Sequence, residues 1–315
     1  MNHLDSNTPS VSIIMNCLDC SKYLREAIDS VYAQTYKNWE IIFWDNASSD
    51  NSAEIARSYD KRLKYFRGEE TVLLYAARNL ALKETEGEFI SFLDCDDKWL
   101  PQKLEKQIYV LENRPDIDFI YSNYFKIIMP RSDRLILGLK SKQPEGSVFE
   151  RFLYHYPVNL QTVVLRKAVL NKFDTLFDEK LNLSGDYDLF MRVLYNSKAA
   201  YLHDPLLIYR IHSDMCSIRF MSDYPKENSY IIEKLKRMDP FFEIKYKAVI
   251  NYVNAKISYW EARSAMANAS NKKAREYLSP YKLLNFNFFI LYLATFFPKK
   301  IWDLLQEIKM RNIFS

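Results

Sequence analysis

Short apolar runs alternate with longer segments of helical periodicity over the first part of the chain. The apolar runs, each short enough for one strand, are 11–14, 41–44, 63–66, 89–93 and 117–121. The segments between them carry apolar residues at helical spacing and are 21–34, 50–58, 73–81 and 101–111. Strands that alternate with helices are typical of βαβ units. The sequence therefore predicts an α/β fold with a mainly parallel, Rossmann-like sheet flanked by helices.

Polar residues follow three of these predicted strands. Asn16 and Asp19 come after the first strand, and Asp45 comes after the second. After the fourth strand, "ISFLDCDDKWL" places three carboxylates within four positions. Parallel sheets bind ligands at the carboxyl ends of their strands, so we expect these side chains to line one site. The preference of Asp and Asn for turns explains an isolated polar residue there, but it explains the acidic cluster poorly.

The acidic motif, defined as residues 94–97, carries Asp94, Asp96 and Asp97. Like charges packed together cost free energy unless a cation offsets them. Mg²⁺ and Mn²⁺ prefer carboxylate oxygens, with phosphate and water completing the shell. The chain has only five glycines, and neither a dinucleotide-binding Gly-x-Gly-x-x-Gly nor a Walker loop is present. A nucleotide here would need another countercharge, and a Mn²⁺ or Mg²⁺ ion on the acidic motif is the candidate.

The amino-acid composition limits the class of protein and the cellular compartment that we expect. The 315 residues are 48% hydrophobic and 27% charged, as in soluble globular proteins of one or two domains. A net charge of +4 does not argue for a nucleic-acid partner, so none is expected. The charge is uneven: from Lys226 onward the net charge is +8 (16 Lys/Arg against 8 Asp/Glu). No signal-peptide pattern is visible at the N-terminus, which predicts a cytoplasmic protein.

The four cysteines suggest no disulfide framework, which fits a reducing compartment. Cys17-x-x-Cys20 fits a redox pair or half of a zinc site. No second close pair of Cys or His completes such a site in the sequence. We therefore favour the interpretation that these are ordinary small apolar residues.

Several motifs in order carry a family resemblance. "VSIIMNCLDCSKYLREAIDSVYAQTYKNWEIIFWDNASSDNSAEI", followed by "ARNLALKETEGEFISFLDCDD", resembles the nucleotide-sugar half of family 2 glycosyltransferases, which have the GT-A fold. A looser resemblance continues through "LSGDYDLFMRV" and "YRIHSDMCS". It implies a catalytic domain over 1–223, with a nucleotide-sugar half over about 9–125 and an acceptor half over about 126–223. The remaining 224–315 is expected to be a helical C-terminal region.

The resemblance also implies roles for residues of the nucleotide-sugar half. The usual Pro-Thr-Tyr-Asn at the first strand exit is matched by Asn16, Cys17, Leu18 and Asp19, which depart from it at all four positions. Asp45 matches the acid that accepts a hydrogen bond from the imide N–H of a uracil-type base. An ionised carboxylate suits this contact because it only accepts hydrogen bonds. Further along the donor, the matching residues are Arg78 near the diphosphate and Asp94, Cys95 and Asp96 near the ribose and metal. Asp96 matches the direct metal ligand, Asp94 is the second candidate ligand, and Asp97 is a weaker candidate.

In the acceptor half, Asp186 matches the general base that takes the proton of the acceptor hydroxyl. The acid that usually precedes the base is Gly185 here. The alternative is that Asp186 only caps a helix, and Asp188 is the second choice for the base. Arg210 and His212 match a segment near the diphosphate or metal, where His can ligate the ion and Arg can grip phosphate. For these two the alternative is a surface loop.

Aromatic and amide side chains near the start of the acceptor half form a candidate acceptor pocket. They are Tyr154, Tyr156, Asn159 and Gln161. Aromatic faces suit sugars, but tyrosine is frequent throughout this chain, which weakens the inference.

The C-terminal region contains an apolar stretch, Leu283–Phe297, of 15 residues. About 20 residues are needed to span a bilayer as a helix. We favour peripheral membrane contact through 283–311 at the inner face of the plasma membrane, with basic residues facing anionic lipid. The alternative is a buried helix that packs on the catalytic domain or on a second subunit of a homo-oligomer.

Together these observations predict an inverting, metal-dependent transfer of a sugar from a nucleoside-diphosphate sugar, UDP-linked, to a saccharide or lipid-linked saccharide acceptor. Family resemblance suggests bacterial surface polysaccharide synthesis. Two alternatives stay open: a non-catalytic nucleotide- or sugar-binding module, and a nucleotidyltransferase. A phosphatase of the haloacid dehalogenase type is disfavoured, because its Asp-x-Asp follows the first strand.

Overall fold

The computed structural model describes residues 9–130, 134–213 and 215–305. They form two compact units, the first made of residues up to Phe152 and Tyr156–Met215, the second of Leu153–His155 and the chain from Cys216. The second unit therefore includes two short stretches, Leu153–His155 and 216–223, that the expected boundary after residue 223 assigns to the first domain.

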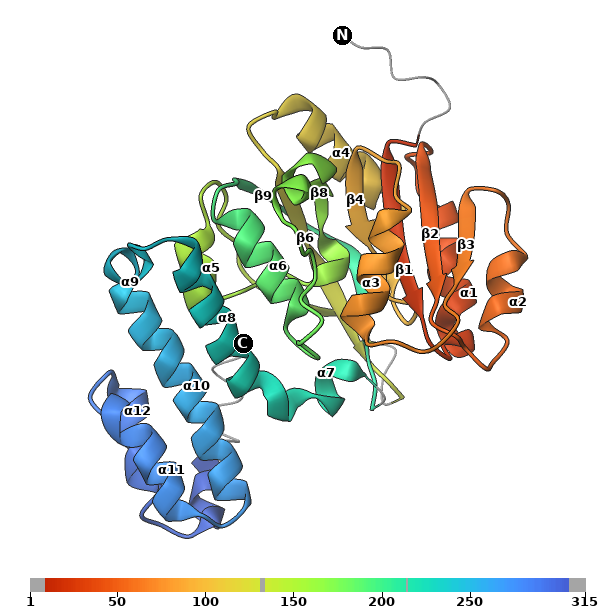
Figure 1. Cartoon of the computed structure of the whole chain (residues 1–315). Helices are drawn as coiled ribbons and strands as arrows, with labels where there is room; N and C mark the ends of the chain where they lie inside the picture. The colour runs from red at the N-terminus through yellow and green to blue at the C-terminus, as the bar shows by residue number, and fades with distance from the viewer. Residues whose placement is uncertain (1–8, 131–133, 214, 306–315) are drawn as a thin grey trace. The chain divides into compact units, whose positions relative to one another are not determined.

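One sheet organises the first unit (Figure 1). Its strands are β1 (Val11–Cys17), β2 (Trp39–Asp45), β3 (Leu63–Arg67), β4 (Phe89–Phe92), β5 (Lys98–Trp99), β6 (Phe119–Ile128), β7 (Ile136–Leu137), β8 (Val164–Arg166) and β9 (Ala199–Ile211). The strand order is β3-β2-β1-β4-β8-β6-β9-β5, and β7 pairs with β6. The β3-β2-β1-β4 part is parallel, as the βα rhythm predicts. Beyond β4 the pairing is mixed, because β8 and β5 run antiparallel to their neighbours.

Helices cover this sheet, as expected. They are α1 (Ser21–Tyr32), α2 (Ser52–Arg57), α3 (Leu74–Lys83), α4 (Lys103–Asn113), α5 (Phe149–Tyr154) and α6 (Gly185–Leu194). In α1 the buried stripe is Leu24, Ala27, Ile28 and Val31, the helical spacing read from the sequence. Helix α3 contacts β1 and β2 and lies next to β1 in Figure 1. Two 3₁₀ turns, Leu160–Thr162 and Lys167–Lys172, flank β8.

Gly87 has a different role from the one its position suggests. A glycine at that point of the sequence could end the third helix, but α3 ends at Lys83 with Glu84 as its C-cap. Gly87 instead lies against β1, where an added Cβ would be 2.6 Å from the backbone nitrogen of Ser12. Its own N–H donates to Ser12 Oγ at 2.8 Å. Only glycine allows this approach between the α3–β4 connection and β1.

The short strand β5 was not predicted, yet it connects the two halves of the site. It follows the acidic motif directly and pairs antiparallel with β9, Lys98 opposite Ile208 and Trp99 opposite Leu207. Leu100 N–H also donates to Leu206 O at 2.9 Å. This pairing brings the end of β9, which is distant along the chain, beside the acidic motif.

The second unit is helical, as expected for the C-terminal region. Its helices are α7 (Cys216–Arg219), α8 (Tyr224–Met238), α9 (Phe242–Lys245), α10 (Lys247–Ala267), α11 (Asn271–Leu278) and α12 (Phe286–Ala294), with 3₁₀ turns at Met221–Asp223 and Ser279–Tyr281. Small and apolar side chains of α10, α11 and α12 form its core, together with Trp302. Within the described residues no helix has both the length and the apolar character to cross a bilayer.

Candidate active site

The acidic motif forms a tight turn where β4 ends. Asp97 N–H donates to Asp94 O at 3.2 Å, which closes the turn. One carboxylate oxygen from each of Asp94, Asp96 and Asp97 lies within 4.8 Å of the others. Asp94 and Asp96 are partly exposed, whereas Asp97 is fully buried. The motif thus presents two accessible carboxylates and one internal carboxylate.

Asp94 is held by two side chains from other elements. Arg78 of α3, which is 5% exposed, donates from Nη2 to Asp94 Oδ1 at 2.9 Å. Gln161 donates from Nε2 to Asp94 Oδ2 at 2.5 Å. Each carboxylate oxygen has two lone pairs, so these bonds leave acceptor capacity for a cation. The structure therefore joins the predicted residues Arg78 and Asp94, and it moves Gln161 from the acceptor pocket to the acidic motif.

Asp96 contacts the end of β9. His212 Nε2 lies 2.9 Å from Asp96 Oδ2. Arg210 donates from Nη1 to Asp96 O at 2.7 Å, and its backbone N–H donates to Asp97 Oδ1 at 2.7 Å. Arg210 Nη2 also donates to Glu26 Oε2 of α1 at 2.5 Å. Arg210 and His212 are thus part of the site rather than of a surface loop, and the Arg210 guanidinium braces the motif.

Asp97 differs from the other two acids. Its Oδ2 is buried and has no hydrogen-bond partner among the described residues. Burial, together with the neighbouring Asp96 charge, raises the pKa of Asp97 well above its usual range, although the Arg210 N–H opposes this. The clear role of Asp97 is to accept the backbone N–H of Arg210, which holds β9 against the acidic motif. The carboxylate oxygens of Asp94, Asp96 and Asp97 lie close enough to share one ion, and such oxygen ligands fit Mn²⁺ or Mg²⁺. Ligation by His212 stays a prediction.

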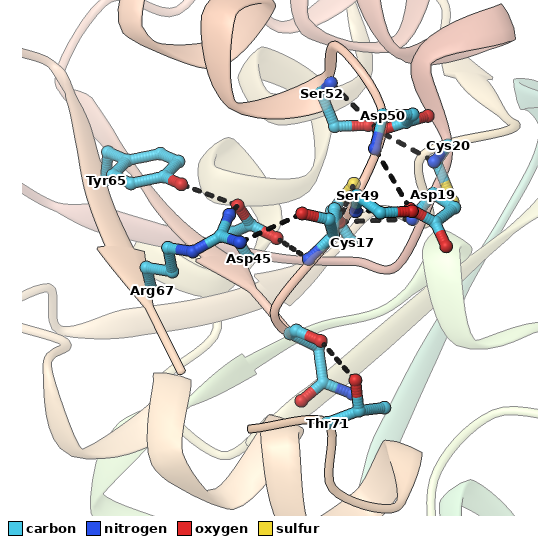
Figure 2. Close-up of polar contacts among 12 residues, drawn as sticks. Cys17, Asp19, Cys20, Asp45, Ser49, Asp50, Ser52, Tyr65, Arg67 and Thr71 are labelled. Atoms are coloured by element: carbon cyan, nitrogen blue, oxygen red, sulfur yellow. Dashed lines mark hydrogen bonds and ion pairs between the residues drawn. The ribbon is translucent and has the colours of Figure 1, made fainter. Parts of the chain in front are cut away.

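Asp45 is the last residue of β2 (Figure 2). Its buried carboxylate accepts from Ser48 N–H at 2.7 Å, from Tyr65 Oη at 2.5 Å and from Arg67 Nη1 at 2.5 Å. Burial alone would raise the pKa of Asp45, but these hydrogen bonds and the Arg67 charge lower it. Asp45 is therefore an ionised acceptor. The Asp45 side chain is fully buried beneath these partners, so a contact with a base stays a prediction.

Asp19 lies in the turn after β1 with a positive φ of 53°. Its Oδ1 accepts from Ser49 N–H at 2.7 Å and from Asp50 N–H at 3.2 Å. Asp50 in turn accepts from Ser21 N–H at 2.9 Å at the start of α1. Figure 2 shows how these side chains join the β1 and β2 loops. In this structure the Asp19 side chain braces two loops, and a contact with nucleotide stays a prediction.

Asn16 lies near the end of β1, between β2 and the acidic motif. Both polar atoms of its side-chain amide are buried, and neither has a hydrogen-bond partner among the described residues. A buried amide without partners costs free energy comparable to a lost hydrogen bond, so such a group calls for an explanation. Its backbone carbonyl accepts a hydrogen bond from Cys95 Sγ at 3.3 Å. The unpaired amide supports the predicted ligand contact at this position.

Asp186 lies in the first turn of α6, where Ser184 is the N-cap. Burial raises the pKa of the Asp186 carboxyl, while the charge of Arg78 and backbone N–H groups oppose the rise and Asp94 adds to it. Asp186, Arg78 and Asp94 thus influence one another electrostatically, as members of one site do. Asp188, the second choice, is fully buried and paired with Arg192 at 2.7 Å, which makes it a structural residue.

Gly185 replaces the usual acid for a steric reason. An added Cβ at Gly185 would lie 2.5–2.6 Å from the ring of Tyr75, whose hydroxyl donates to Leu183 O at 2.9 Å. Tyr75 therefore occupies the space that a side chain at 185 would need. Nearby, the hydroxyl of Tyr156 is buried and has no hydrogen-bond partner among the described residues. Tyr156 packs edge-on against Tyr187. Burial raises the pKa of the Tyr156 hydroxyl well above its ordinary value, and the charge of Asp186 adds to the rise.

Sequence reasoning missed three residues that hold the site together, Glu26, Tyr65 and Arg67, and also the structural role of Gln161. Arg67 ends β3, so the rule that polar side chains gather at the carboxyl ends of strands would have found it. Glu26 gives no local signal, because its contact with Arg210 depends on the distant β5–β9 pairing.

Comparison with known proteins agrees with this geometry. The family model described as "Glycosyl transferase family 2" matches residues 12–171. An uncharacterized glycosyltransferase, RT0329 of Rickettsia typhi, is 31% identical over 238 residues, covering 74% of each chain. The UDP-Glc:alpha-D-GlcNAc-diphosphoundecaprenol beta-1,3-glucosyltransferase WfgD of Escherichia coli is 37% identical over 185 residues, covering 58% of this chain and 69% of WfgD.

Among solved structures, residues 1–349 of S. aureus TarS in complex with UDP-GlcNAc have a TM-score of 0.68 at 20% identity, covering 90% of this chain and 81% of that one. This chain spans 50% of the longer TarS structure. The likeness confirms the GT-A fold. With the family model covering half of the sequence, these findings establish that the chain belongs to glycosyl transferase family 2 and is a glycosyltransferase.

Proposed function

We propose that this protein transfers a sugar, with inversion and with a divalent metal ion, from a UDP-linked donor to a hydroxyl of a saccharide or lipid-linked saccharide. One observation carries the proposal: Asp94 and Asp96 converge in the acidic motif, where Asp96 contacts His212 and Asp94 contacts Arg78, which lies within electrostatic reach of Asp186. The names of two relatives support the donor class, because WfgD is named for UDP-Glc and a lipid-linked acceptor and TarS was solved with UDP-GlcNAc. Bacterial surface polysaccharide synthesis is the corresponding pathway.

The nucleotide would bind along the ends of β1 and β2. Asp45 offers a carboxylate oxygen to the imide N–H of uracil, and Tyr65 and Arg67 hold that carboxylate in place. Asn16 supplies a buried amide whose donor and acceptor are both unpaired among the described residues. A carbonyl group of the base can accept a hydrogen bond from the Asn16 amide N–H, which removes the cost of leaving that donor buried and unpaired.

The diphosphate would lie at the acidic motif. Asp94, Asp96 and His212 are the residues that would hold Mn²⁺ or Mg²⁺, and the ion would offset charge on the departing diphosphate. Arg78 adds a fixed positive charge through its bond to Asp94. Arg210 holds β9 against the acidic motif by donating hydrogen bonds to Asp96 O and to Glu26.

The acceptor hydroxyl would lie between Asp186 and Tyr156. The Asp186 carboxylate takes the proton of the hydroxyl as its oxygen attacks the anomeric carbon, and the diphosphate leaves from the opposite face. The raised pKa of Asp186 makes it a stronger base than an exposed aspartate. The Tyr156 hydroxyl, unpaired within the described part of the chain, is placed to orient the acceptor.

The test is a donor screen on the full-length protein. With Mn²⁺, UDP-glucose and UDP-GlcNAc are expected to raise the melting temperature, because a ligand at 100 times its Kd stabilises the native state by about 2.7 kcal/mol. Slow release of UDP without acceptor is expected as well, and EDTA should suppress both effects. GDP-mannose is the matched control. A thermal shift without UDP release would identify a binding module, and no shift with any UDP-sugar would contradict the proposed donor.

Peripheral membrane contact belongs to this proposal, and the surface of the second unit supports it. Eight large apolar side chains between 283 and 304 are exposed, among them Leu283 (82%) and Phe286 (75%). They are Leu283, Phe286, Phe289, Leu293, Phe296, Phe297, Ile301 and Leu304. Lys299 and Lys300 are exposed in the same segment. An apolar surface with adjacent lysines fits the boundary of an anionic bilayer, which would place the protein at the inner face of the plasma membrane.

We expect the double variant Leu283→Ser/Phe286→Ser to weaken binding to vesicles that contain anionic lipid, measured by sedimentation, by about 10²–10⁴-fold. Burial of each large apolar side chain is worth about 1.5–3 kcal/mol, so the loss of two is measurable. Ile244→Ser, on α9, removes an equally exposed side chain (76%) and serves as the matched control. Vesicle binding that is unchanged in the double variant, with a dimer of the unaltered protein that the same changes dissociate, would favour the homo-oligomer alternative instead.

A further inference from the structure

Three cysteines converge beside the proposed nucleotide site from two chain segments. Cys17 is the last residue of β1, Cys20 directly precedes α1, and Cys95 lies in the acidic motif after β4. Their sulfur atoms all lie within 4.8 Å of one another. Figure 2 shows Cys17 and Cys20 on the turn that carries Asp19. The sequence showed only the Cys17-x-x-Cys20 pair, and folding brings the third thiol to it from a distant part of the chain.

Cys17 and Cys95 belong to the apolar core of the sheet and Cys20 packs against that core, but each sulfur also lies near a polar group. Cys20 Sγ lies 3.3 Å from Leu18 O, and Cys95 Sγ lies 3.3 Å from Asn16 O. Ser48 Oγ lies 3.8 Å from Cys17 Sγ. Cys17 and Cys95 are buried, whereas Cys20 is partly exposed, so the cluster has an open side. Three thiols whose sulfur atoms converge, one of them at a partly exposed position, are chemically a ligand set.

The spacing of the sulfur atoms suits a thiophilic ion. A Zn–S bond is about 2.3 Å, which places two sulfur ligands of a tetrahedral site about 3.8 Å apart. Sulfur atoms already within 4.8 Å need only small side-chain shifts to reach that spacing. The carboxylates of the acidic motif prefer the hard ions Mg²⁺ and Mn²⁺, whereas thiolates prefer soft or borderline ions. Ligand chemistry therefore separates two neighbouring sites.

We propose that Cys17, Cys20 and Cys95 bind one thiophilic divalent ion, Zn²⁺, at a site distinct from the carboxylate site of the acidic motif. Three protein ligands leave the fourth position of the tetrahedron to water at the open side near Cys20. Because Cys95 lies between Asp94 and Asp96, the ion fixes the turn after β1 to the acidic motif. It thereby holds two loops of the donor site in one arrangement, and its binding does not depend on the donor or on Mn²⁺.

The test uses Cd²⁺, which thiolates bind with a ligand-to-metal charge-transfer band in the ultraviolet. Titration of the reduced full-length protein is expected to give that band with saturation at one ion per chain. Zn²⁺ should abolish the band by competition. Cys20→Ser is expected to lose it, because it removes one ligand with little change in volume. Two variants should keep it: Cys216→Ser, which replaces the fourth cysteine of the chain, and Asp96→Asn, which disables the carboxylate site.

Three outcomes would overturn the proposal. The first is the absence of a charge-transfer band from the reduced protein. The second is a band that survives in Cys20→Ser or disappears in Cys216→Ser, since the ligands would then be other residues. The third is a band lost in Asp96→Asn alone, which would assign the ion to the acidic motif. Failure of the donor screen would leave all of these readouts unaffected, so the two proposals can fail separately.

Discussion

Asp96→Asn is expected to lower metal-dependent UDP release and sugar transfer by about 10²–10⁴-fold. A bound divalent ion contributes several kcal/mol of stabilisation to the departing diphosphate, and each 1.36 kcal/mol is about tenfold in rate. Asparagine keeps the size of the side chain and its proximity to His212, which lies 2.9 Å from Asp96 Oδ2. The change therefore removes a charged oxygen ligand with little effect on the fold. The measurement is the rate of UDP release at increasing Mn²⁺ concentration.

Asp204→Asn is the matched control for this variant. Asp204 is an exposed acid of the first unit that pairs with Lys106 at 2.8 Å, away from the residues that form the site. It makes the same change in net charge, so an effect of overall charge would affect both variants alike. If Asp96→Asn kept the Mn²⁺-dependent rate of the unaltered protein, the acidic motif would not be the metal site of the reaction.

The nucleotide-binding half was predictable from the sequence because its signals are local. Each strand is a short apolar run, each helix has a stripe of apolar residues, and β1, β2 and β4 end at the polar residues that were singled out. Because parallel strands end at one edge, Asn16, Asp45 and the acidic motif had to lie near one another. The structure places them accordingly.

The rest of the site depends on pairings that no local pattern encodes. The antiparallel strands β5 and β8 are two and three residues long, too short for periodicity to be visible. The β5–β9 pairing brings Arg210 and His212 to the acidic motif, so only the family resemblance suggested their role. The glycine at 185 likewise looked like a lost acid, until the ring of Tyr75 explained why no side chain fits there.

Asp186→Asn is expected to lower kcat for sugar transfer by about 10²–10⁴-fold, the usual contribution of a positioned general base. Donor affinity should change little, because asparagine keeps the shape of the side chain and the proposed donor contacts lie on β1, β2 and the acidic motif. The measurement is transfer to an acceptor at saturating donor, alongside the thermal shift with UDP-sugar. Asp174→Asn, an exposed aspartate before α6, is the control with the same change of charge.

The pH dependence tests the role of Asp186 as a base more directly than the rate alone. Burial raises the pKa of this carboxyl above the ordinary value of about 3.9. The base is active as the carboxylate, so activity should be full above the raised pKa and should fall as pH drops through it. The acid limb of kcat/KM is therefore expected above the range of an exposed aspartate.

An asparagine side chain does not titrate, so the slow residual transfer of Asp186→Asn should lose that acid limb. A purely structural Asp186 would behave otherwise, because a destabilised enzyme with an intact base elsewhere keeps its acid limb while its amplitude falls. If Asp186→Asn kept the acid limb, a group other than Asp186 would be the general base. Asp188 could take that role only by giving up its buried pair with Arg192, and this cost makes it a poor substitute.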